Sequence, residues 1–102
     1  MRAALASGSP ATAVLCSNDL MAVGALAALR ALGLERRVAV ASWDDSVLCE
    51  TASPSITALQ RRPYDAGRAS ARLLLAALRG TPTEPEPLPG RLVVRESSIA
   101  AP

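Results

Sequence analysis

Apolar residues along the chain form two kinds of pattern, short continuous runs and longer stretches with helical spacing. The runs at residues 12–16 and 38–42 predict buried strands, because each is short and ends at polar residues. The stretch 19–32 between them predicts a helix that closes at Gly33, since glycine is favoured just after a helix end. Strand, helix and strand with short joints predict two parallel strands linked by a right-handed crossover.

The second half of the chain contains one further amphipathic segment. Residues 63–80 predict a helix, since Pro63 suits its first position, Gly80 suits its end and apolar residues recur at helical spacing. Residues 81–90 are rich in Pro and Glu and predict an extended linker. We also expect a helical turn at 46–51, a turn at 52–55 and strands at 56–60 and 91–95. The pattern as a whole predicts an α/β fold with a parallel sheet.

Polar side chains follow both strands of the predicted βαβ unit, Asn18 after the first and Asp44 after the second. Ligands bind beyond the carboxyl ends of strands in an open parallel sheet, and both residues should lie at that edge. An amide offers donors and an acceptor, and a carboxylate offers acceptors, so the pair suits ligand hydroxyl groups. Two other interpretations stay open. Asn18 caps its helix, and Asp44 or Asp45 only holds the following turn.

The residues around Asp44 have further interpretations. Trp43 is interpreted as a packing residue, with a stacking platform for a ligand as the alternative. Asp44 and Asp45 as an acid pair or a magnesium site would indicate an enzyme. Adjacent residues at a strand end point in different directions, however, and the chain has no Lys or His to assist. We therefore expect no enzyme, no catalytic residue and no metal site.

Composition narrows the functional classes further. The chain has 102 residues, 50% of them hydrophobic, a net charge of +2 and no His. Its arginines are scattered and lack interleaved aromatics, so the chain by itself is not expected to bind nucleic acid. The absence of His removes the usual metal ligand and any Ser-His triad. Cys16 and Cys49 fit no zinc or redox motif and are expected to be reduced thiols of a cytoplasmic protein without a cofactor.

Two stretches bear on what surrounds the chain. Residues 20–29 carry no charge on any face of the predicted helix, and such a helix needs cover on its outer side as well. That cover is either another subunit or a further part of the same protein. Residues 1–7 have the pattern of a helix tail, which indicates that the chain begins partway through a larger domain. The apolar runs are too short for a signal peptide or a membrane span.

Five stretches carry family motifs. Residues 13–26 contain an apolar strand, Ser-Asn-Asp and Met-Ala-x-Gly, and residues 38–45 contain an apolar strand followed by aromatic-Asp-Asp. The others are Pro54-Ser55-Ile56-Thr57-Ala58-Leu59, Tyr64-x-x-Gly67-Arg68 and Leu92-Val93-Val94-Arg95-Glu96-Ser97-Ser98. Each motif alone is weak evidence for membership of a family, but five motifs in this order are strong evidence. Over residues 10–99 the chain resembles the LacI/GalR (lactose-repressor) family of transcription regulators.

The resemblance implies a periplasmic-binding-protein-like (type I) sensor domain of which this chain is the C-terminal, incomplete part. Residues 1–60 and 91–99 would belong to the second lobe, residues 63–80 would be a helix of the otherwise missing first lobe, and 81–90 would be the linker. The helix-turn-helix domain of the family is absent from the chain, so operator DNA would be bound only through that absent domain.

The resemblance also assigns roles to residues. Asn18 and Asp44 fall on positions that contact the effector, which agrees with their place at the sheet edge, and Arg61 and Pro63 fall near the same cleft. The implied function is sensing of a small-molecule effector, expected to be a sugar, that controls DNA binding allosterically. A fragment of a periplasmic sugar-binding protein of the same fold is the alternative, and a relic without function is a third interpretation.

By the same resemblance, Val23, Val47 and Ala52 fall on the surface between subunits of a homodimer or tetramer. The sequence also departs from the family pattern. Ser42 stands where glycine is usual, which alters the approach to the pocket. Arg61 and Arg62 replace more neutral residues, which brings an anionic ligand or an acidic sugar into consideration.

Overall fold

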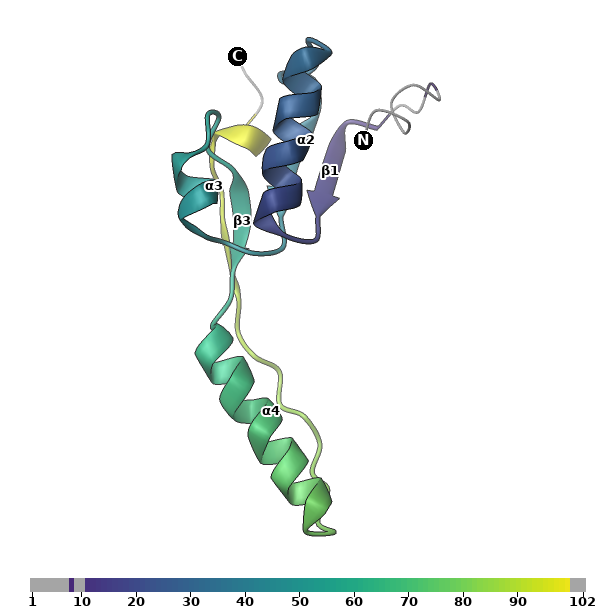
Figure 1. The fold of residues 1–102 in the computed structure, drawn as a ribbon, viewed down its shortest axis with the longest axis vertical. Coiled ribbons are helices and arrows are strands. Elements are labelled where there is room, and N and C mark those ends of the chain that lie inside the picture. The colour runs from purple at the N-terminus through teal and green to yellow at the C-terminus, as the bar shows by residue number, and fades with distance from the viewer. Residues whose placement is uncertain (1–7, 9–10, 100–102) are drawn as a thin grey trace. The chain divides into compact units, whose positions relative to one another are not determined.

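The computed structural model describes residue 8 and residues 11–99, and the chain divides into two compact units. The first unit comprises Met1–Gln60 and Leu92–Pro102, and the second comprises Arg61–Arg91. Figure 1 shows a sheet flanked by helix α2 in the first unit, and helix α4 with an extended segment in the second. The expected helix tail at residues 1–7 lies outside the described residues. No helix within the described ranges is long and apolar enough to cross a membrane.

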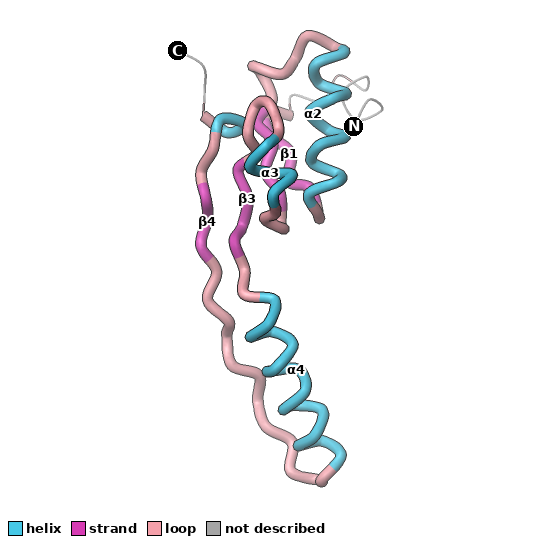
Figure 2. Tube along the Cα trace, turned by 60° about the vertical axis from the view of Figure 1, so that its left-hand side comes forward, coloured by secondary structure: helices cyan, strands magenta, loops and turns pink. Residues whose placement is uncertain are grey.

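Four strands form one sheet in the order β1-β2-β3-β4. β1 (Ala13–Cys16) pairs in parallel with β2 (Ala39–Ser42), and β2 pairs in parallel with β3 (Thr57–Gln60). The short β4 (Arg91–Val93) lies beside β3, as Figure 2 shows. The α/β class and the parallel pairing expected of the βαβ unit are therefore confirmed.

Helix α2 (Asp19–Ala31) connects β1 to β2 and covers one face of the sheet. It is followed by Gly33 with φ of +66°, a left-handed conformation that favours glycine at this place. Its inward side consists of small and branched apolar residues that join the core, namely Ala22, Ala25, Leu26 and Leu29. These side chains pack with buried strand residues, of which Val40 and Ala58 are fully inaccessible to solvent.

The short helix α3 (Val47–Thr51) fills the side of the core next to α2. It begins after Ser46, whose hydroxyl oxygen accepts a hydrogen bond from the backbone N–H of Leu48 at 3.1 Å. Cys49 is fully buried, and its carbonyl oxygen accepts from the backbone N–H of Ile56 at 2.8 Å. This bond fixes the turn that leads into β3.

The end of the chain closes the first unit through buried hydroxyl groups. The short 3-10 helix η1 (Glu96–Ser98) places the Ser97 hydroxyl to donate to the carbonyl oxygen of Val40 at 2.6 Å and to accept from the N–H of Thr57 at 2.9 Å. The Thr57 hydroxyl in turn accepts from the N–H of Arg95 at 2.8 Å. These bonds connect β3 and β2 to a segment that comes 40 and 57 residues later in the chain.

The second unit is built on helix α4 (Pro63–Leu78), none of whose residues is buried. Its ends follow local rules, with Pro63 at the first position and Gly80 at φ of +72° after the end. Residues 81–90 contain neither helix nor strand, as expected for the linker.

Most boundaries differ from expectation by one or two residues. The closing strand was expected at residues 91–95 and ends at Val93. It ends early because the N–H of Arg95 donates to the Thr57 side chain, after which the chain turns into η1. The outer side of α2 is uncovered within the described residues, with Leu20 at 69% and Val23 at 38% exposure.

Candidate ligand site at the carboxyl ends of the strands

Asn18 and Asp44 occupy equivalent places at one edge of the sheet. The register pairs Cys16 of β1 with Ser42 of β2, and each candidate residue lies two positions after its strand. The backbone N–H of Trp43 donates to the carbonyl oxygen of Cys16 at 2.8 Å, which continues the pairing beyond the strand ends. Adjacent parallel strands lie about 4.8 Å apart, so the two residues belong to neighbouring positions of one rim. This juxtaposition agrees with the sequence-based expectation.

Asn18 is also the N-cap of α2, which was the alternative interpretation. Its side-chain oxygen accepts a hydrogen bond from the backbone N–H of Met21 at 2.8 Å. The cap uses the oxygen of the amide and fixes the direction in which the side chain points. The NH₂ group of the same amide supplies the two donors with which it can bind a ligand acceptor.

Asp44 is held by Ser42, the residue that stands where the family pattern has glycine. The Ser42 hydroxyl donates to the Asp44 carbonyl oxygen at 2.7 Å and lies 3.2 Å from the Asp44 backbone nitrogen, from which it accepts. Ser42 is 1% exposed and Asp44 is partly buried. The serine therefore adds a side-chain anchor to the loop that carries the candidate carboxylate.

Asp45, the neighbouring acid, forms a structural ion pair with Arg95. Its carboxylate accepts two hydrogen bonds from the Arg95 guanidinium, at 2.8 and 3.0 Å, and both side chains are largely buried. Hydrogen bonding to Asp45 raises the pKa of Arg95 above its ordinary value. Arg95 also donates to the carbonyl oxygen of Ile56 at 2.8 Å. This pairing leaves Asp44 and Asp45 in different environments and does not support a paired-acid site.

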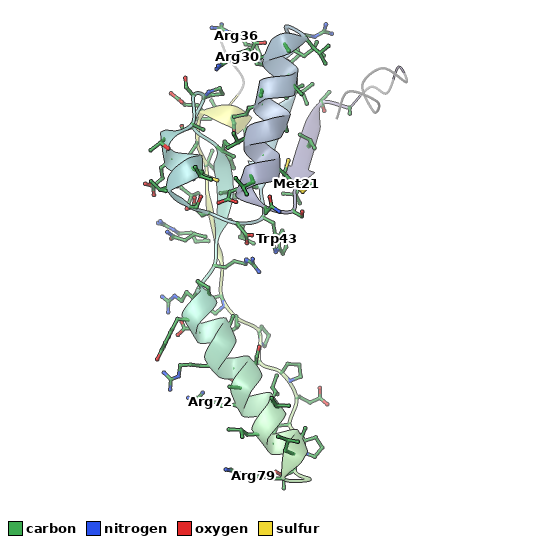
Figure 3. The ribbon with its side chains drawn as sticks, viewed as in Figure 1. Met21, Arg30, Arg36, Trp43, Arg72 and Arg79 are labelled. Carbon is green, nitrogen blue, oxygen red and sulfur yellow. The ribbon has the colours of Figure 1, made fainter. Side chains whose placement is uncertain are left out.

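The same rim carries one more acid and the only tryptophan. Hydrogen bonding from Ser46 lowers the pKa of Asp19, with a smaller contribution from the backbone N–H of Leu20. Trp43 is 47% exposed and lies at the same end of the first unit as Met21 (Figure 3). Its exposure argues against the interpretation of Trp43 as a purely packing residue.

The remaining candidates belong to other elements of the chain. Arg61 and Pro63 belong to the second unit, Pro63 as the first residue of α4. Of the expected subunit-contact residues, Val47 is 67% exposed and Val23 is 38% exposed, whereas Ala52 packs partly buried against the core. The described residues contain no group of three or more acidic, Cys or His side chains placed to hold a metal ion.

Sequence reasoning missed the structural role of two residues that shape this end of the fold. Arg95 was noticed only as part of a motif, because its partner Asp45 is fifty positions away in the chain. Ser97 was likewise only a motif residue. The signal available in the sequence was the position of a polar pair, Ser97-Ser98, next to an apolar strand.

Burial raises the pKa of the Cys16 thiol, which agrees with an unreactive reduced cysteine.

Comparison with known proteins identifies the domain. The family model for the periplasmic binding protein-like domain matches residues 1–98. The chain is 38% identical over 104 residues to the HTH-type transcriptional regulator MalR of Streptomyces coelicolor, covering 93% of this chain and 29% of MalR. It is 40% identical over 101 residues to the HTH-type transcriptional regulator CelR of Thermobifida fusca, covering 95% of this chain and 30% of CelR. The chain thus spans under a third of the length of these relatives.

Solved structures give the same result. A complex of the transcriptional regulator CelR with cellobiose is 41% identical, with a TM-score of 0.69 over 85% of this chain and 28% of that one. The Lac repressor dimer bound to operator is 29% identical, with a TM-score of 0.76 over 96% of this chain and 35% of that one. These relatives are regulators, which favours that interpretation over the periplasmic alternative. The chain belongs to the periplasmic-binding-protein-like domain family and corresponds to the ligand-sensing portion of LacI-type transcription regulators.

Proposed function

We propose that this chain senses a sugar through the rim formed by Asn18 and Asp44 and transmits that binding to a DNA-binding domain outside it. The observation that carries the proposal is the placement of an amide and a carboxylate at equivalent ends of two paired parallel strands. Such a pair supplies both donors and acceptors, as sugar hydroxyls require. The complex of CelR with cellobiose, at 41% identity, supports a sugar as the class of effector.

We assign the residues of the chain to two lobes of the sensor domain, in line with the two compact units of the structure. Residues 1–60 and 91–99 form part of one lobe, and the helix at 63–80 belongs to the other, with 81–90 as linker. The boundaries of the two compact units, at residues 60/61 and 91/92, support this assignment. An effector held between two lobes shifts the population of their arrangements, and so of the DNA-competent state. Arg61 and Pro63, which belong to the second unit, are further proposed contacts of the effector.

The proposed regulator is a cytoplasmic homodimer or tetramer, and its subunit surface includes Val23, Val47 and Ala52. The exposed apolar side chains of Val23 on α2 and Val47 on α3 support this assignment, because α2 and α3 pack together in the first unit. The Lac repressor neighbour is a dimer on its operator. No catalytic step is proposed, since the relatives reported above are transcription regulators.

The ligand site is tested by grafting residues 10–99 into CelR of Thermobifida fusca in place of the matched segment. Because Asn18→Ala would also remove the helix cap, the better variant is Asn18→Ser, which keeps a cap oxygen and removes the amide donors. We expect Asn18→Ser and Asp44→Asn each to weaken binding of the best sugar by about 10- to 150-fold in calorimetry, as hydrogen bonds to charged or bidentate groups do. Operator binding without sugar should persist.

The control variant is Arg72→Ala, on an exposed position of α4. It should leave sugar affinity unchanged. If the graft binds its sugar equally well with both rim substitutions present, the ligand site lies elsewhere.

The subunit surface is tested in the same graft by Val23→Asp. A charge on this exposed position should convert the dimer to a monomer in analytical ultracentrifugation while the circular dichroism spectrum stays the same. A variant that remains dimeric would remove Val23 from the interface. A variant that unfolds would show that α2 is covered by the same chain.

A further inference from the structure

A cavity of about 680 Å³ lies in the first unit at the end of the sheet opposite the rim of Asn18 and Asp44. Thr12 and Ala39, which stand at the beginnings of β1 and β2, form part of its wall. Its volume is within the usual range for small-molecule sites, and all of its lining residues belong to the first unit. Nothing in the proposed sensing function uses this end of the strands.

Three arginine side chains line this cavity. The Arg30 guanidinium donates to the carbonyl oxygen of Ser53, which fixes it at the carboxyl end of α2. Arg36 and Arg37 stand on a turn held by hydrogen bonds from the N–H groups of Arg37 and Val38 to one carbonyl, that of Leu34, at 2.9 and 3.1 Å. Figure 3 shows Arg30 and Arg36 together at this end of α2. None of the three forms an ion pair with another described residue.

Two carboxylates also line the cavity, and they differ in their hydrogen bonds. Glu96 accepts from the N–H of Ser55 at 2.8 Å and from its hydroxyl at 3.0 Å. Glu35 has a buried carboxylate oxygen with no hydrogen-bond partner among the described residues. A buried acceptor without a donor is costly, so a hydroxyl donor from a ligand would be favourable there.

The charge balance favours an anion that also carries hydroxyl groups. Three guanidinium groups face two carboxylates, one of which is already occupied by Ser55. The carboxyl end of α2 carries the negative end of the helix dipole, which disfavours an anion. Its last carbonyl groups, however, already accept hydrogen bonds from the N–H groups of Leu32, Gly33 and Leu34. Guanidinium groups bind phosphate through paired hydrogen bonds, and a free carboxylate oxygen binds hydroxyl donors.

We propose that this cavity binds a phosphorylated polyhydroxy compound, such as a sugar phosphate. The phosphate contacts Arg30, Arg36 and Arg37, and a hydroxyl group donates to the free oxygen of Glu35. The site is separate from the rim of Asn18 and Asp44, since the two lie beyond opposite ends of the same strands. This proposal does not depend on the sugar specificity of the rim.

The test uses the 102-residue chain. Binding of the phosphate compounds is measured by phosphorus NMR, binding of glucose by proton NMR of the sugar, and folding by circular dichroism. Glucose 6-phosphate, inorganic phosphate and glucose are titrated at equal ionic strength. We expect glucose 6-phosphate to bind more tightly than inorganic phosphate, and glucose alone not to bind at this site. A ligand that binds the native state raises the melting temperature or increases the folded fraction of a marginal chain.

The double variant Arg36→Ala/Arg37→Ala should weaken binding of glucose 6-phosphate at least tenfold. Arg72→Ala/Arg79→Ala on the second unit removes the same charge and serves as the matched control, with binding unchanged. Asn18→Ser should also leave it unchanged. The proposal is overturned if the phosphate compounds neither bind nor increase folding, or if both double variants reduce binding equally. Equal affinity for inorganic phosphate and glucose 6-phosphate would overturn the role of Glu35.

Discussion

Each unit of the chain contains an apolar helix, α2 in the first and α4 in the second, and the two helices differ greatly in burial. Every described residue classed as buried lies in the first unit, including Leu29, Val40 and Ile56. In the second unit, Leu74 and Leu78 are 61% and 75% exposed, and α4 buries no residue. A helical pattern is therefore sufficient to predict a helix but does not say what the helix packs on. The first unit contains its own core, and α4 relies on local interactions.

The local interactions of α4 are weak ones. Arg62 lies 3.6 Å from the carboxylate of Asp65, and the Arg68 guanidinium lies 5.9 Å from the ring centre of Tyr64. Exposed pairs of this kind contribute about 0–1 kcal/mol each. In proteins most of the stability of a helix comes from the packing of its apolar face rather than from helix propensity. The difference between the units predicts that substitutions of the same type will have large effects in the first and small effects in the second.

The largest effect is expected from Arg95→Ala. It leaves the Asp45 carboxylate buried without its partner, and breaking a buried ion pair in this way costs about 3–5 kcal/mol. Urea unfolding followed by the fluorescence of Trp43, the only tryptophan, reports on the first unit. A variant within about 1 kcal/mol of wild type would show that this pair contributes little to the first unit.

Leu29→Ala and Leu78→Ala make the same change in the two units. Leu29 is fully buried, so its replacement should lower the free energy of unfolding by about 2–5 kcal/mol. Leu78 is 75% exposed, and its replacement should change stability by less than about 0.5 kcal/mol. Urea unfolding by circular dichroism measures both. Equal costs would mean that α4 is packed as firmly as α2, against the comparison made above.

A smaller effect is expected for Gly67→Ala, in the middle of α4. Apart from the neighbouring residues and the backbone of α4 itself, no atom lies within 4 Å of the added methyl group, so the change acts through helix propensity. We expect a gain of about 0.5–1 kcal/mol in the stability of α4, seen as higher helical signal in circular dichroism. Trp43 fluorescence unfolding should stay unchanged, and a shift in that midpoint would show that the two units unfold together.

The smallest effect concerns pH. Hydrogen bonds from the backbone N–H and the hydroxyl of Ser55 lower the pKa of Glu96 below its ordinary value of 4.5. A carboxyl group whose pKa is lower in the folded state stabilises the fold above its unfolded pKa, and this contribution is lost as pH falls through the folded value. The acid-induced loss of stability below pH 4.5 should therefore be shallower in Glu96→Gln than in wild type. Parallel pH profiles would show that the Ser55 contacts do not stabilise the charged form.

Elements defined by neighbouring residues were predictable from the sequence. Gly33 and Gly80 end their helices with positive φ, and the apolar runs gave β1 and β2 nearly to the residue. The cavity near Arg36 and the hydroxyl contacts of Ser97 were not predictable. They bring together residues far apart in the chain, and composition and periodicity carry no signal for such contacts.

The candidate rim was predictable only in its placement. Parallel pairing put Asn18 and Asp44 at one edge, because strand ends in a βαβ unit share a direction. The hydrogen bonds that each rim residue makes were visible only in the structure. Asn18 uses its oxygen for the cap, Asp45 is committed to Arg95, and Ser42 anchors the loop of Asp44.

The hydrogen bonds of the Ser97 and Thr57 hydroxyl groups also affect the order in which this chain can complete its fold during synthesis. The hydroxyl group of Thr57 forms its hydrogen bonds with Arg95 and Ser98, of which Arg95 comes first, thirty-eight residues later in the chain. A ribosome adds about 5–20 residues per second, so the gap corresponds to roughly 2–8 seconds of translation. During that interval β2 and β3 lack the partners that Ser97 brings to Val40 and Thr57. The residues of the first unit are therefore synthesised before α4, but the unit cannot complete its fold until its last segment is made, after all of α4.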